Sequence, residues 1–284
     1  MYATLAINNS KHSGELIGTH QKLDRSARFM MQKYLGKEAQ KFPTIDEILR
    51  FEGAFGPDGL KRKSPGVDEP EHFIQPDHDD GVLKTYIENH YYNLAHALAD
   101  GNTVRASFEA AWMAHALTDG LTPAHHFPFR KVVDELMTDH DYVKLMGIEV
   151  KGIMRGNSLA QTVRNNWLYI GAGGIMTKHM AYEYGVAYTI SSIPYKRLLP
   201  KDVKRSDFND VNYMETFYKA LYKVAKMDMY NEFLRTGWNT QLIVETRDFL
   251  IPEIIRVIAL CWSAALRESE RIIEDREEQQ SDEV

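Results

Sequence analysis

The sequence predicts an all-α fold, organised as one multi-helix domain that spans residues 1–284. In several long segments, apolar residues recur every three or four positions, which is the period of an amphipathic helix. No internal repeat and no series of alternating strand patterns is visible in the chain. Hydrophobic residues make up 44% of the chain and charged residues 26%, values typical of a globular protein with a sizeable core.

Charge and cysteine content narrow the functional classes. The net charge of −6 argues against a broad, sequence-independent affinity for nucleic acid or anionic lipid, although a local site stays open. Cys261 is the one cysteine, so no intrachain disulfide can form. The first residues show no signal-peptide pattern, which predicts a cytoplasmic protein, or a secreted one if a signal was removed. The apolar run Phe249–Leu266 contains Pro252 and Glu253, so we expect a core helix and no transmembrane segment.

A first helix is expected to begin at His20. The apolar stripe from Leu23 to Met30 follows His20 on one face, and Asp24 and Arg25 are expected to face away from it. Taken alone, a histidine at the head of such a stripe is more often a hydrogen-bonded core residue than a metal ligand.

The next elements are a capped turn, a loop and a second long helix. Phe42–Phe55 predicts a short helix with Thr44 as its N-cap. Residues 53–70 are dense in glycine, proline and charge and predict a loop, in which Asp58 taken alone is an ordinary turn residue. Val82–Asp100 is expected to be helical.

The segment Ala110–His126 has the strongest chemical pattern in the chain. We expect a helix capped by Thr103, on which His115 and Asp119 are four residues apart and share one inward face. A buried aspartate needs partners, and His125 follows six residues later. Imidazole and carboxylate ligands at this spacing suit Zn²⁺. A buried His–Asp hydrogen bond beside surface histidines is the alternative.

The remainder of the chain contains one more such pair. His179 and Glu183 are also four residues apart, a spacing that taken alone is most often a surface helix pair. Asp207–Leu234 is expected to be one helix, and another is expected to start at Pro252. Residues 269–284 form a charged C-terminal tail that we expect to fray.

The candidate residues follow one another in an order that resembles the zinc-dependent phospholipase C family, which is related to the single-strand-specific 3′-nucleotidase/nucleases. Three segments carry the similarity: THQKLDRSARFMM, EHFIQPDHDDG and ALTDGLTPAHH. The matching side chains are His20, Asp58, His72, His115, Asp119, His125, His179 and Glu183. The resemblance implies that all eight are metal ligands, and it spans most of the chain.

In that family the ligands hold a trinuclear zinc cluster. The resemblance implies one zinc on Asp58, His72, His115 and Asp119, and a second on His125, His179 and Glu183. His20 and a bridging Asp119 would contribute to a third zinc.

Two departures from the family pattern affect these expectations. The family's N-terminal tryptophan, which ligates the third metal, has no counterpart here, because the first tryptophan is Trp112. We therefore expect two zinc ions and leave the third open, with His12 as a candidate substitute. Residues 127–178 are longer than the usual connection and predict an insertion near the rim of the cleft.

The expected function is hydrolysis of phosphoric esters by a zinc-activated water, with Asp58 as a ligand that also orients or deprotonates that water. A phospholipid is the first substrate expectation. One alternative is a single-strand nuclease or 3′-nucleotidase, in which aromatic residues stack on the bases. Candidates for such stacking are Phe127, Phe129, Trp167 and Tyr182. Another is a non-catalytic, metal-stabilised helical domain that binds a partner. The sequence leaves the oligomeric state open.

Overall fold

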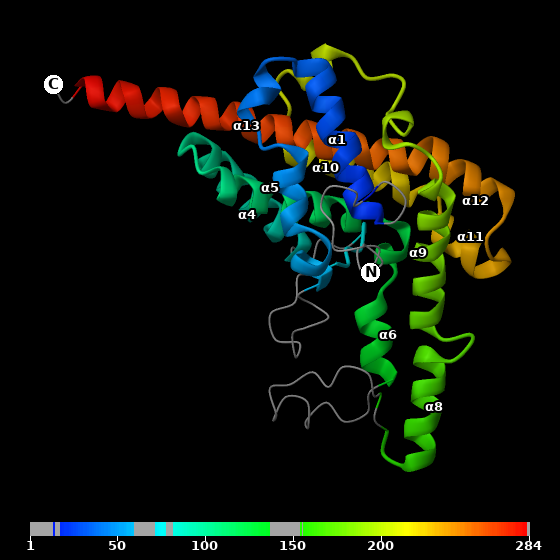
Figure 1. Cartoon of the computed structure of the whole chain (residues 1–284). Helices are drawn as coiled ribbons and strands as arrows, with labels where there is room; N and C mark the ends of the chain where they lie inside the picture. Colours follow the sequence, from blue (N-terminus) through cyan, green and yellow to red (C-terminus); the bar gives the residue numbers. More distant parts are fainter. Residues whose placement is uncertain are drawn as a thin grey trace.

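The computed structural model describes residues 14, 18–59, 72–77, 82–136, 154 and 156–282. These residues form helices joined by short turns, with no strand among them, so the all-α prediction is confirmed (Figure 1). The α-helices are α1 (Thr19–Leu35), α2 (Ile45–Ile48), α4 (Val82–Ala99), α5 (Thr103–Gly120), α6 (Phe129–Leu136), α8 (Leu159–Ile170), α9 (Ile175–Ser191), α10 (Tyr213–Ala225), α11 (Met229–Thr236), α12 (Thr240–Glu245) and α13 (Ile251–Asp282).

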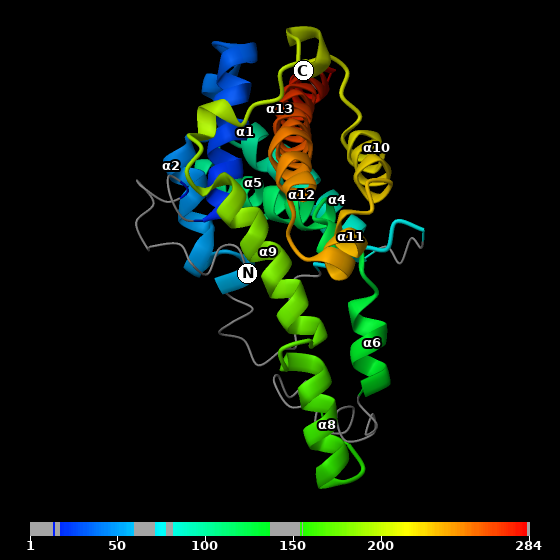
Figure 2. The ribbon, with the colours of Figure 1, turned by 90° about the vertical axis from the view of Figure 1, so that its right-hand side faces the viewer.

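The first half of helix α13 is buried in the bundle, and α13 packs against α1, α4, α5 and α10, while its C-terminal end projects beyond the bundle (Figures 1 and 2). Trp262 on α13 is fully buried, and its indole Nε1 donates a hydrogen bond of 3.0 Å to the carbonyl of Ala110 on α5. Residues Thr240–Ser281 are long and apolar enough to cross a membrane, but 83% of their most apolar window is buried inside the protein. This burial agrees with the expected core helix.

The predicted starts of α2 and α5 hold to within one residue. Thr44 caps α2 with its side chain, and Glu47 returns the bond to the Thr44 backbone, which completes a capping box. Helix α2 is shorter than expected and continues as two 3₁₀ turns up to Phe55. Asn102, rather than Thr103, caps α5 by accepting a hydrogen bond from the Arg105 backbone.

Two expectations about the helices were wrong. Asp24 and Arg25 are buried, because the first turns of α1 are enclosed by neighbouring elements on several sides. Asp207–Leu234 is not one helix: α10 ends at Ala225, and Asp228 takes a left-handed conformation with φ 53° before α11 begins. The charged tail is part of α13, which is helical to Asp282.

Helices α6 and α8 extend away from the bundle in the same direction in both views, and we call this pair the arm (Figures 1 and 2). Asn165 on α8 donates a hydrogen bond of 2.5 Å to the carbonyl of Leu136 at the end of α6. A short turn, Gly171–Gly174, joins α8 to α9. The arm belongs to the expected insertion, residues 127–178, of which 137–153 and 155 lie outside the described residues. His12 also lies outside them.

Candidate metal centre

Six separate parts of the chain bring the eight candidate ligands together. Helix α1 supplies His20, α5 supplies His115 and Asp119, and α9 supplies the last pair. The remaining three come from turns and from the segment 72–77. Each of the eight residues is at most 5% exposed, and the set is His20, Asp58, His72, His115, Asp119, His125, His179 and Glu183.

Asp119 lies at the middle of this group. Its Oδ1 is 3.6 Å from Nε2 of His20 and 3.5 Å from Nδ1 of His125. Its Oδ2 is 3.3 Å from Nε2 of His115 and also contacts Nδ1 of His72. One buried carboxylate therefore contacts four imidazoles, which is the arrangement expected of a ligand shared between metal ions.

A second set of ligands is formed by His125, His179 and Glu183. Glu183 Oε1 lies 3.1 Å from Nε2 of His125 and 3.0 Å from Nε2 of His179. The two imidazole rings are stacked, with centroids 5.1 Å apart and planes inclined by 7°. The ring of Phe73 packs against both, at 5.2 Å and 5.7 Å. Helix α9 places His179 and Glu183 one turn apart on its buried face, so this pair is not a surface pair.

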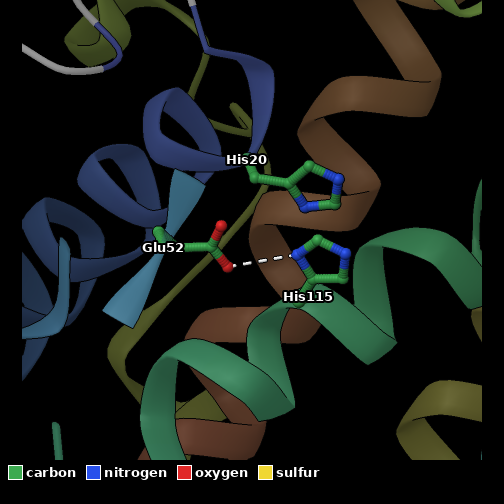
Figure 3. A group of neighbouring side chains, drawn as sticks. All are labelled: His20, Glu52 and His115. Atoms are coloured by element: carbon green, nitrogen blue, oxygen red, sulfur yellow. Dashed lines mark hydrogen bonds and ion pairs between the residues drawn. The ribbon is translucent and has the colours of Figure 1, made fainter. Parts of the chain in front are cut away.

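Glu52 is a member of the centre that the sequence analysis missed. It is 3% exposed, and its Oε1 lies 3.2 Å from Nδ1 of His115. The other ring nitrogen of His115, Nε2, faces Asp58 at 3.7 Å as well as Asp119. The ring of His20 stacks on that of His115 with a centroid distance of 3.9 Å (Figure 3). No helical periodicity marks Glu52, which lies between two 3₁₀ turns.

In the centre, burial and the charges of neighbouring side chains shift the pKa values of the histidines and carboxylates. Burial, followed by the charge of His115, lowers the pKa of His20 to about 3. Burial alone would raise the pKa of Asp119, but the charges of His125 and His115 outweigh it and hold the pKa well below its usual range. Burial would lower the pKa of His115, yet Asp119 and Glu52 raise it well above its usual value. The Asp119 carboxylate is thus ionised and requires buried positive charge beside it.

The donor set fits zinc. Three groups have ligand atoms that all lie within 4.8 Å of one another, and they are His20–Glu52–His115, Asp58–His72–His115 and His125–His179–Glu183. Two ligands of one zinc ion, each about 2.0–2.2 Å from it, lie at most about 4.4 Å apart, so small side-chain adjustments suffice. Nε2 of His115 and Nδ1 of His125 are buried and face the two oxygens of Asp119 at 3.3 and 3.5 Å, as expected of atoms that converge on metal ions.

These groups reproduce most of the expected ligand assignments as neighbours in space. Asp58, His72 and His115 lie together, and so do His125, His179 and Glu183. For the uncertain third position, the structure places Glu52 beside His20 and His115. The role of each residue as a ligand stays a prediction.

The aromatic residues expected near the site have different environments. Tyr182 is fully buried in the core, so the expectation that its ring could stack on a base was wrong. Phe127 packs against the core and contacts the ring of Tyr230. Trp167 is 67% exposed on α8.

Comparison with known proteins finds a similarity in fold but no match to a family model or a curated sequence. The chain matches no protein-family model, and no curated protein sequence matches it. Among solved structures, it resembles the alpha-toxin of Clostridium perfringens from avian strain SWCP, with a TM-score of 0.55 and 12% sequence identity. The similarity covers 90% of this chain and 65% of the toxin chain. The chain is therefore similar in fold to about two thirds of the length of that toxin.

Proposed function

We propose that this protein is a metal-dependent hydrolase of phosphoric esters. The main support is the convergence of buried carboxylates and imidazoles on Asp119, which joins ligand groups from α1, α5 and the turn after α5. Such a shared carboxylate suits a cluster of zinc ions better than an isolated structural site. The ligand order that resembles the zinc-dependent phospholipases C supports the same reading, as does the fold similarity.

Zinc, when bound, neutralises phosphate oxygens and supplies an activated water for attack on phosphorus. The protein's own residues hold and orient the reactants. Burial would raise the pKa of Asp58, but the nearby charge of His115 outweighs this and lowers it, so the carboxylate is ionised at neutral pH. An ionised Asp58 can accept a proton from the attacking water and hold it in line. Glu52 fixes the ring of His115 through Nδ1, which directs Nε2 toward Asp58 and Asp119.

A phospholipid is the substrate class that we favour. The resemblance of the segment around His72 to the phospholipases supports it. A nuclease needs aromatic faces that are open to bases. Tyr182 is buried and Phe127 is packed against the core, and the exposed Trp167 lies out on α8.

The test combines metal content with hydrolysis. Protein purified without added metal is analysed by elemental mass spectrometry and assayed on a short-chain phosphatidylcholine analogue and on single-stranded DNA. Asp119→Asn removes the shared charge, so we expect it to lose metal and at least about a hundredfold in activity. Asp100→Asn is the matched control, because Asp100 is 54% exposed on its side chain and pairs with Arg276 away from the centre.

The possible results distinguish a phospholipase, a nuclease and a non-catalytic domain. Hydrolysis of the lipid analogue by the wild type and the control, but not by Asp119→Asn, supports the proposal. Cleavage of DNA alone favours the nuclease. Bound zinc without turnover of either substrate would contradict catalysis and favour a metal-stabilised interaction domain. Full activity of a zinc-retaining Asp119→Asn variant would refute the assignment of the centre.

A further inference from the structure

Helix α8 exposes most of its apolar residues, and its one buried residue is polar. Leu159, Val163, Trp167 and Ile170 are 83%, 63%, 67% and 56% exposed. With 100° of rotation per residue, they lie within an arc of about 80° on one side of the helix. We call this set the α8 stripe. In an ordinary surface helix of a globular protein, such a stripe faces the core.

The opposite side of α8 holds the arm together. Asn165 is the one buried residue of this helix, and its amide donates to the carbonyl of Leu136 on α6. Its neighbour Asn166 donates hydrogen bonds to the carbonyls of Met154 and Thr162. Polar contacts therefore fix the orientation of α8, and this orientation turns the α8 stripe outward.

The stretch of sequence that carries the α8 stripe differs in charge from the rest of the chain. Residues 154–182 contain no aspartate or glutamate, although the whole protein has a net charge of −6. Arg164 lies on α8 beside the stripe, and Lys178 lies on α9 near the root of the arm; both are exposed. An apolar face with a tryptophan and with basic residues at its border is typical of helices that lie at a lipid–water interface.

The arm is rooted in the candidate metal centre at both ends. His125 precedes α6 by four residues, and the Gly171–Gly174 turn after α8 leads into the part of α9 that carries His179. The arm is therefore continuous in sequence with the two segments that carry His125 and His179.

We propose that the α8 stripe docks this protein on an anionic phospholipid surface. This inference rests on the proposed function, since docking would bring the enzyme to a substrate that is held in a bilayer. A second copy of the chain fits the stripe less well, because symmetric pairing of two α8 helices brings two Arg164 side chains and no carboxylate of residues 154–182 into the interface.

The experiment measures co-sedimentation with vesicles of phosphatidylcholine mixed with phosphatidylglycerol. We expect the wild type to bind and Val163→Glu to bind on the order of tenfold or more weakly, since it puts a charge in the apolar face. Val104→Glu is the matched control, because Val104 is 70% exposed at the opposite end of α5 from Asp119. We expect Trp167 emission to shift to shorter wavelength on the vesicles, and Trp167→Phe to remove that shift.

Three further readouts keep the outcome interpretable. Hydrolysis of a monomeric short-chain phosphatidylcholine analogue needs no surface, so we expect Val163→Glu to retain it, which also shows that the variant is folded. Vesicle binding without hydrolysis would contradict the proposed function and leave the docking surface standing. Equal binding by Val163→Glu and the wild type would overturn the docking proposal. A wild-type dimer that Val163→Glu converts to a monomer would also overturn it, in favour of a contact between copies.

Discussion

Replacing Lys22 tests how α1 and α9 are held together. The buried ammonium of Lys22 donates hydrogen bonds to the carbonyls of Ile190, Ser191 and Ile193, at 2.9, 2.8 and 3.1 Å. These carbonyls lie at the C-terminal end of α9, where the helix macrodipole also favours a positive charge. Lys22→Met keeps most of the length of the side chain and removes the charge and all three donors.

The size of the effect follows from the exposure of the three carbonyls. A hydrogen bond to a charged group contributes about 1.5–3 kcal/mol, so three would sum to roughly 5–9 kcal/mol. Ser191 and Ile193 are half-exposed, so water can replace two of these bonds after the substitution. The carbonyl of the buried Ile190 is left without its donor. We therefore expect Lys22→Met to lower the free energy of unfolding by about 2–4 kcal/mol.

Urea unfolding followed by circular dichroism measures this change, with Lys33→Met as the control on the exposed side of the same helix. The control is expected to stay within about 0.5 kcal/mol of the wild type. A change below about 1 kcal/mol for Lys22→Met would refute the reasoning, because the three carbonyls would then not depend on the ammonium.

Two further predictions concern the centre itself. Glu52→Gln keeps the shape of the side chain but weakens the contact that orients His115, so we expect a loss of about 10–100-fold in zinc affinity. Competition with a chromogenic chelator measures this affinity. An unchanged affinity would show that Glu52 does not belong to the centre. In the metal-free protein, the pKa of His20 is about 3, below its ordinary 6.5, so between these values the unfolded chain binds more protons and stability falls as pH falls. His20→Gln cannot take up that proton, and the fall measured by denaturant unfolding should be shallower by up to about 1.4 kcal/mol per pH unit; parallel curves would contradict this.

The sequence was most informative where one helix controls the outcome. The apolar period located α1, α4 and α5, and the four-residue spacing put His115 with Asp119 and His179 with Glu183 on shared faces. The break at Asp228 could not be predicted, because no glycine or proline marks it. The burial of Asp24 was missed for a related reason, since other elements enclose that side of α1.

Local sequence patterns alone could not predict which residues belong to the centre. Asp58 looks like an ordinary turn residue, and only the order of all eight candidates identified it. Glu52 is not among those eight candidates, so their order could not identify it. It contacts His115 across 63 positions of sequence, and a pairing of that kind depends on how α5 packs against the turns after α2.

The position of α13 at the end of the chain has a consequence for biosynthesis. All eight candidate ligands lie between residues 20 and 183, so the ribosome has produced them before α13 begins at Ile251. The core that fixes their spacing cannot close until Trp262 emerges and packs against α5. A nascent chain therefore carries the complete set of metal-binding groups without the scaffold that arranges them, and a chain truncated before α13 would retain the ligands but lose the centre.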